Sequence, residues 1–151
     1  MKLLLTALVI IPVIGYSQIQ VKNSTTTSQE NIIGEVKLKN VLVSKLTYDV
    51  SGRDTVFTFT FSNAKNSFLS DYQMIVFVDI KSFRSFYEAI QSVFADENKR
   101  NKDYKVELTI SDMKVVISSF RNKGDLSAKI ETDNGFTYLS EKQAVQLFGS
   151  K

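Results

Sequence analysis

Alternating apolar and polar residues predict that most of this chain forms β-strands. The clearest case is residues 55–62, in which Phe57, Phe59 and Phe61 alternate with threonines. A period of two places the three rings on one face of a strand, opposite the polar residues. Such a face is typical of a strand that packs against a core. We therefore expect the rings to be buried, and not to form an exposed platform for nucleobases or sugars.

The same alternation recurs along the chain between short polar segments. Further strands are expected at residues 35–39, 42–50, 104–110, 113–120, 126–130 and 136–139. The segments between neighbouring strands are rich in Gly, Asn, Asp and Ser, and include residues 51–54, 111–112, 121–125 and 133–135. Because these residue types favour tight turns, the pattern predicts consecutive hairpins and an antiparallel sheet.

One strand has a different pattern. Residues 74–78 read Met-Ile-Val-Phe-Val and are apolar at every position. A strand with apolar side chains on both faces is typical of one that is covered on both sides. We therefore expect this strand to lie in the centre of the sheet.

Two segments have the spacing of amphipathic helices. Residues 80–95 place apolar side chains on one face, and Asp79 is the expected N-cap. The second helix is expected after Ser140, with Gln143 placed to complete a capping box and Gly149 to end the helix.

These elements together predict an α+β fold. The expected architecture is an antiparallel sheet of about seven to eight strands, with two helices packed on its apolar side. Each half of the chain has several strands followed by a capped helix, which is the order expected of a duplicated ββββα unit. Any capped amphipathic helix produces a similar junction, so coincidence remains the alternative.

The N-terminal residues predict export. Lys2 precedes an apolar stretch, and Gly15 and Ser17 supply the small residues that a signal peptidase needs before Gln18. We therefore expect residues 1–17 to be a signal peptide, because the apolar stretch is shorter than a membrane-spanning helix. Residues 18–31 are rich in Ser and Thr and are expected to be a flexible lead-in. Residues 32–151 form the expected single domain.

Missing residue types exclude several chemistries. The chain contains no His, Cys or Trp, which excludes histidine acid–base catalysis, thiol nucleophiles, disulfide scaffolds and Cys/His zinc sites. Without cysteine, lipidation of a mature N-terminus is also excluded. Export without disulfides is typical of bacteria. The mature protein is therefore expected to be bacterial, soluble, without a transmembrane segment, and periplasmic or extracellular.

The charge of the chain is modest. Its 19 basic and 16 acidic residues give +3, which falls to +2 after removal of Lys2 with the signal peptide. A candidate basic patch in the second half consists of Lys99, Arg100, Lys102, Lys105, Arg121 and Lys123. It would suit an acidic glycan, a lipid head group or a protein partner. Acidic residues are interspersed among these bases, so a mixed solvated surface is the alternative interpretation.

Two short motifs match known functional patterns. Residues 111–114 match the S-x-x-K motif of penicillin-recognising enzymes, but Ser111 lies in an expected turn and not at a helix start, which indicates a chance match. Residues 54–56, Asp-Thr-Val, resemble the acceptor sequence of a bacterial O-glycosylation system. Thr55 is therefore a candidate glycosylation site.

Carboxylates are the acid–base groups that remain. Asp49 and Asp54 flank one expected turn, and Glu131 and Asp133 flank another, so either pair is a candidate for calcium. Neither pair has EF-hand spacing, and Asp is common in turns for local reasons. The sequence therefore assigns no catalytic, cofactor-binding or metal-binding residue.

The expected function is a non-catalytic binding or interaction module of the cell envelope, or a secreted one. A protein partner or an envelope glycan is expected, without a cofactor and without nucleic acid. Strand addition at a sheet edge is the expected mode of docking. The alternative is a carboxylate- or metal-dependent hydrolase of envelope glycans, which requires two converging carboxylates. A small-ligand carrier with an apolar cavity is a third hypothesis.

Overall fold

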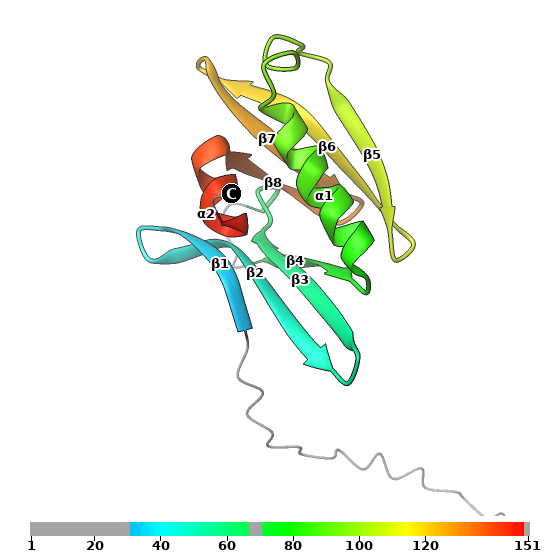
Figure 1. The fold of residues 1–151 in the computed structure, drawn as a ribbon. Coiled ribbons are helices and arrows are strands. Elements are labelled where there is room, and N and C mark those ends of the chain that lie inside the picture. The colour runs from blue at the N-terminus through cyan, green and yellow to red at the C-terminus, as the bar shows by residue number, and fades with distance from the viewer. Residues whose placement is uncertain (1–30, 67–70, 150–151) are drawn as a thin grey trace, which may run out of the picture.

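The elements follow the order ββββα twice along the chain (Figure 1). The structure is a computed structural model that describes residues 31–66 and 71–149. The predicted signal peptide, and the predicted lead-in apart from Asn31, lie outside these residues. Within them, neither helix is long and apolar enough to cross a membrane.

Each half of the chain forms one four-stranded antiparallel sheet with neighbouring strands in sequence order. Sheet 1 contains β1 (Asn31–Leu38), β2 (Val41–Ser51), β3 (Asp54–Ser62) and β4 (Tyr72–Phe77), and α1 (Ile80–Val93) follows it. Sheet 2 contains β5 (Lys105–Ile110), β6 (Met113–Asn122), β7 (Asp125–Thr132) and β8 (Gly135–Ser140), and α2 (Glu141–Phe148) follows it. The predicted α+β class and number of strands are confirmed, with the strands divided between two sheets.

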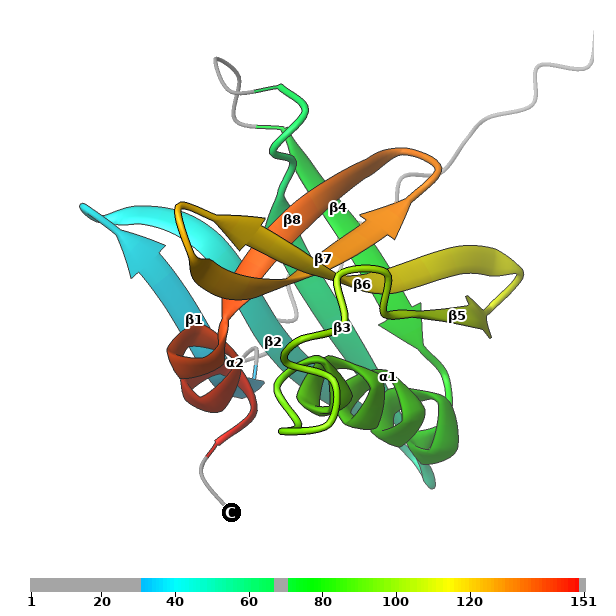
Figure 2. The ribbon, with the colours of Figure 1, turned by 90° about the horizontal axis from the view of Figure 1, so that it is seen from above.

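Each helix packs against both sheets. α1 contacts β4 of sheet 1 and β5, β6 and β7 of sheet 2, and α2 contacts β1 and β2 of sheet 1 and β7 and β8 of sheet 2. The helices also contact each other beneath the crossed sheets (Figure 2). Both sheets therefore bury their apolar faces against the two helices, and the two halves share one core.

Aromatic rings of β3 contribute to the core, as the alternating phenylalanines predict. Phe59 and Phe61 are fully buried, and Phe57 stacks on Phe83 of α1 with ring centroids 4.3 Å apart. Both predicted helix starts are confirmed. Asp79 accepts a hydrogen bond from the Ser82 N–H at 2.8 Å.

The second helix has the predicted caps. Ser140 and Gln143 form a complete capping box. Gly149 is the C-cap residue, and its φ of 86° is a value that glycine adopts without strain.

The predicted position of β4 is wrong. β4 is not central but is the last strand of sheet 1, paired with β3 alone. Ile75 and Phe77 are fully buried, whereas Met74 and Val78 are 59% and 62% exposed. The helices and the shared core lie on the Ile75 side, so the described elements leave the Met74 side uncovered.

A buried asparagine joins the two sheets. Asn63, just after β3, is 2% exposed, and its Nδ2 donates to Asp71 Oδ2 at 2.8 Å and to the Asn134 carbonyl at 3.2 Å. Its Oδ1 accepts from the Phe136 N–H at 3.3 Å, and the Ala64 N–H donates to the Phe136 carbonyl at 2.8 Å. These bonds fix the first residues of β8 against the end of β3.

Candidate functional site

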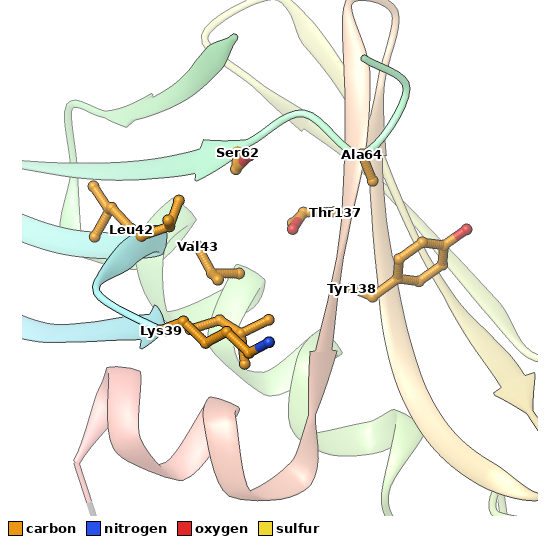
Figure 3. Close-up of a pocket in the computed structure, with 9 residues that line it drawn as sticks. Lys39, Leu42, Val43, Ser62, Ala64, Thr137 and Tyr138 are labelled. Carbon is orange, nitrogen blue, oxygen red and sulfur yellow. The ribbon is translucent and has the colours of Figure 1, made fainter. Parts of the chain in front are cut away.

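An open cleft of about 430 Å³ lies between the β1–β2 hairpin of sheet 1 and β8 of sheet 2 (Figure 3). We call it the hairpin cleft. Its apolar lining consists of Leu38, Val41, Leu42, Val43 and Ala64. Lys39, Ser62, Thr137 and Tyr138 complete the lining. A mainly apolar cleft of this size with a few polar groups is typical of a small-ligand site.

The two walls of the cleft are held by different parts of the fold. The hairpin turns at Lys39 and Asn40, whose φ angles of 49° and 68° are those of a tight turn between twisted strands. β8 is held at Phe136 by the bonds from Asn63 and Ala64. The cleft therefore exists because two sheets meet at this point.

Three polar side chains of the cleft have no partner among the described residues. Thr137 is only 2% exposed, yet its hydroxyl makes no hydrogen bond there, and it projects from β8 toward the hairpin (Figure 3). The Ser62 hydroxyl, which also lines the cleft, makes no hydrogen bond with the described residues either. The Lys39 side chain extends from the hairpin toward β8 and forms no ion pair with the residues that the structure describes (Figure 3).

The backbone of Tyr138 adds two more polar groups. The Phe136 N–H and C=O point toward β3, away from β7. Backbone direction alternates along a strand, so Tyr138, two residues later, directs its N–H and C=O to the same side. At Tyr138 that side is the hairpin cleft.

The corresponding contact in the other half is closed. The β5–β6 hairpin turns at Ser111 and Asp112 with φ angles of 47° and 65°, and the Ser111 hydroxyl donates to the Val76 carbonyl of β4 at 3.3 Å. The predicted turn at residues 111–112 is thereby confirmed. No equivalent bond among the described residues joins the β1–β2 hairpin to β8, which leaves the hairpin cleft open.

The four edge strands of the two sheets differ in how they are protected. β1 has two register irregularities, and its Gly34 lies so close to the Leu147 carbonyl of α2 that a Cβ atom would not fit. β5 carries charges, with Lys105 paired to Glu107 at 3.3 Å. β8 is bound by residues 63–64 at its start. Bulges, charges and coverage are the usual means by which proteins block edge pairing.

β4 has no register irregularity and no charged residue between Tyr72 and Phe77, and the β5–β6 hairpin covers it only at Val76. Asn63 N–H bonds to the Asp71 carbonyl, so the odd-numbered residues of β4 face β3 and the even-numbered residues face the free edge. Val76 C=O receives the Ser111 hydroxyl, whereas the edge-facing backbone groups of Tyr72 and Met74 have no partner among the described residues.

The outward side chains of β4 are also apolar. Tyr72, Met74 and Val76 of β4 and Val78 just after it are 38%, 59%, 39% and 62% exposed. The Tyr72 hydroxyl donates to the Leu42 carbonyl of β2 at 3.3 Å. We call these four side chains and the backbone edge beside them the β4 edge. An exposed apolar edge strand with free backbone groups is a site for pairing with another strand.

Two carboxylates flank the β4 edge. Hydrogen bonds from Asn66, Asn63 and Gln73 lower the pKa of Asp71. The backbone N–H and hydroxyl of Ser82 lower the pKa of Asp79. Both groups are therefore negatively charged at neutral pH.

The candidate basic patch is only partly assembled. Arg121 donates to the carbonyls of Lys99 and Gly124, which brings the β6–β7 turn against the loop after α1. Lys99 pairs with Asp96 at 3.0 Å, which raises the pKa of Lys99, and Lys105 pairs with Glu107. The other members, Arg100, Lys102 and Lys123, are exposed or partly exposed around the same loop and turn.

The two candidate calcium pairs, Asp49 with Asp54 and Glu131 with Asp133, lie outside the hairpin cleft. Glu131 and Asp133 line a separate hollow of about 360 Å³ together with Lys114. Glu131 is bound by Lys129 at 2.7 Å. The described residues contain no group of three His, Cys, Asp or Glu side chains that could hold a metal ion.

The candidate glycosylation site lies at a strand end. Thr55 pairs with Val50 in the β2–β3 ladder, next to the turn at Gly52, and its side chain is partly exposed. It contacts neither the hairpin cleft nor the β4 edge.

The sequence contained a signal for one of the two sites. The apolar run in β4 was visible, although we interpreted it as burial. The hairpin cleft had no such signal, because residues 38–43 and 137–138 are distant in the chain. No family model, curated protein or solved structure matches this chain, so its fold and surface geometry carry the functional argument.

Proposed function

We propose that this protein is a non-catalytic interaction module that binds a partner protein by strand addition to the β4 edge. The observation that carries this proposal is the contrast among the edge strands. β1 also exposes Ile32 and Leu38, but its pairing is irregular and Gln146 of α2 donates to its Glu35 carbonyl at 2.8 Å. β5 is charged and β8 is bound at its start, whereas β4 has regular pairing and combines exposed apolar side chains with backbone groups of Tyr72 and Met74 that are unpaired among the described residues. Natural proteins rarely leave such an edge without a use.

The chemistry of the edge favours a polypeptide over a glycan. The free N–H and C=O groups of Tyr72 and Met74 are spaced as another strand requires. The side chains of Met74 and Val76 offer apolar contact to alternate residues of that strand. Asp71 and Asp79 at the two ends favour basic residues beside the partner's apolar segment.

The location belongs to the same proposal. The expected signal peptide and the absence of cysteine support an exported bacterial protein that acts in the cell envelope or outside the cell. The hydrolase alternative receives no specific support, because no carboxylate lines the hairpin cleft.

The test uses the mature protein, residues 18–151, isolated gently from its own cells and examined by native mass spectrometry. The double variant Met74→Lys/Val76→Lys places charges on the β4 edge. Thr60→Lys is the matched control, because Thr60 is opposite Met74 in the ladder but lies on an interior strand. We expect the double variant to lose the partner and the control to retain it.

Amide hydrogen exchange locates the contact in the same complex. The proposal requires that Tyr72 and Met74 amides become protected when the partner binds. A partner that binds the double variant as tightly as the wild type would overturn strand addition at β4. The mature domain isolated without a partner, and with a measurable turnover of an envelope glycan, would overturn the non-catalytic assignment.

A further inference from the structure

We propose that the hairpin cleft binds the carboxylate end of an acyl chain, as in a free fatty acid. This is a second binding function, which uses none of the residues of the β4 edge. Three observations carry it: the apolar walls, the lysine at the cleft without an ion-pair partner, and the Thr137 hydroxyl, which lines the cleft and makes no hydrogen bond with the described residues.

The walls suit a hydrocarbon chain. Leu38 and Val41 are 64% and 62% exposed, although both are large apolar residues in a hairpin. An acyl chain lying between the hairpin and β8 would remove this surface from water, which is the main source of affinity for apolar ligands. Leu42, Val43 and Ala64 continue the same apolar surface toward β3.

The polar groups suit a carboxylate. Lys39 is the one charged residue in the described lining of the cleft, and it has no ion-pair partner there. The hydroxyls of Thr137 and Ser62 and the N–H of Tyr138 can all donate to carboxylate oxygens. Since no Asp or Glu lines the cleft, nothing in the lining repels an anion.

A peptide strand fits this cleft less well than an acyl chain. Phe136 already uses its N–H and C=O for Asn63 and Ala64, and the Ser140 N–H donates to Gln143 Oε1 at 2.9 Å. Tyr138 is thus left as the residue of β8 whose edge-facing groups are free for a ligand. One residue cannot hold a strand in register, whereas an acyl chain needs no backbone hydrogen bonds.

The test titrates the mature protein, residues 18–151, with decanoate and with the uncharged 1-decanol by calorimetry. Lys39→Gln removes the charge, and Thr137→Val removes the hydroxyl at nearly constant shape. Lys123→Gln is the matched control, because Lys123 has the same kind of turn conformation, with a φ of 51° against 49° for Lys39, but lies outside the cleft. Amide chemical shifts recorded during the titration identify the residues that contact the ligand.

We expect saturable binding of one decanoate, with shifts at residues 38–43 and 137–138. Lys39→Gln should weaken decanoate about fivefold, as expected for a partly exposed ion pair. Thr137→Val should weaken it about tenfold, because a charge-assisted hydrogen bond to the carboxylate is lost. Lys123→Gln should leave the affinity unchanged, and the affinity for 1-decanol should be the same with Lys or Gln at position 39.

The proposal is overturned by any of three results: no saturable binding, shifts that lie away from the cleft, or equal decanoate affinity in the wild type and in both cleft variants. The Met74→Lys/Val76→Lys variant should bind decanoate normally. Failure of the acyl-chain proposal is therefore distinguishable from failure of strand addition at β4.

Discussion

Gly135 packs so closely against the side chain of Asn63 that a Cβ atom at position 135 would overlap the Asn63 amide group. The contact joins the end of β3 to the first residue of β8, which belong to different sheets. It thus lies at the junction between sheet 1 and sheet 2, next to the bonds that hold β8, which is one wall of the hairpin cleft.

Substitution at this contact should destabilise the fold. We expect Gly135→Ala to lower the free energy of unfolding by about 1–3 kcal/mol, because the added methyl group displaces Asn63 from its hydrogen bonds. In an Asn63→Ala background the same substitution should cost clearly less. Urea unfolding of the four proteins in a double-mutant cycle measures the coupling. If the changes in the free energy of unfolding are additive, the overlap is relieved without displacing Asn63, which would contradict this prediction.

A substitution at Ser44 should stabilise the fold. It is fully buried on β2, and its hydroxyl has no hydrogen-bond partner among the described residues. We expect Ser44→Ala to raise the free energy of unfolding by about 1 kcal/mol, since an unsatisfied polar group is removed. Ser62→Ala, with its hydroxyl open to the cleft, should change the value by less than about 0.5 kcal/mol. Destabilisation by Ser44→Ala in urea unfolding would contradict the assignment.

Asp71 should make stability depend on pH. Its pKa is lowered from 3.8 by hydrogen bonds from Asn66, Asn63 and Gln73 in the folded state. Its contribution is therefore present above the unfolded-state pKa and is lost as the pH falls through the lower folded-state pKa. We expect Asp71→Asn to lose less stability than the wild type between neutral pH and about pH 3. An equal loss in both proteins, measured by urea unfolding, would refute this role.

Hydrogen exchange of the isolated protein tests the orientation of β4. The amides of Gln73 and Ile75 face β3, whereas those of Tyr72 and Met74 face the free edge. We therefore expect Tyr72 and Met74 to exchange much faster than their two neighbours. Uniform protection along the strand would mean that the edge is already occupied, for example by a second copy of the chain.

Local sequence patterns predicted strand faces, helix ends and turns correctly, because the physical causes of these features act between neighbouring residues. The alternation of Phe57, Phe59 and Phe61 predicted a buried face because side chains alternate across any strand. Asp79, Ser140 and Gly149 predicted helix ends because capping satisfies backbone groups within a few residues. The turn at residues 111–112 followed from turn chemistry, and Ser111 lies in that turn and not at a helix start.

The apolar run of β4 shows that a local pattern does not predict which faces of a strand are buried. The run is compatible with burial on both faces and equally with one buried and one exposed apolar face. The choice between them depends on which elements cover the Met74 side, and this is a property of the packed molecule. An apolar run therefore does not show by itself that both faces of a strand are buried, and the exposed face of β4 is the surface that supports the proposed function.

Sequence patterns were enough to predict the α+β class, the strand and helix segments and the helix caps, because periodicity and capping act over a few residues. The division of the strands between two sheets, the packing of each helix against both sheets and the position of β4 at an edge depend on tertiary packing. The hairpin cleft depends on it too, since Lys39 and Thr137 line one cleft only when the two sheets pack. Both candidate sites therefore depend on long-range packing, which balances many weak contacts across the whole chain.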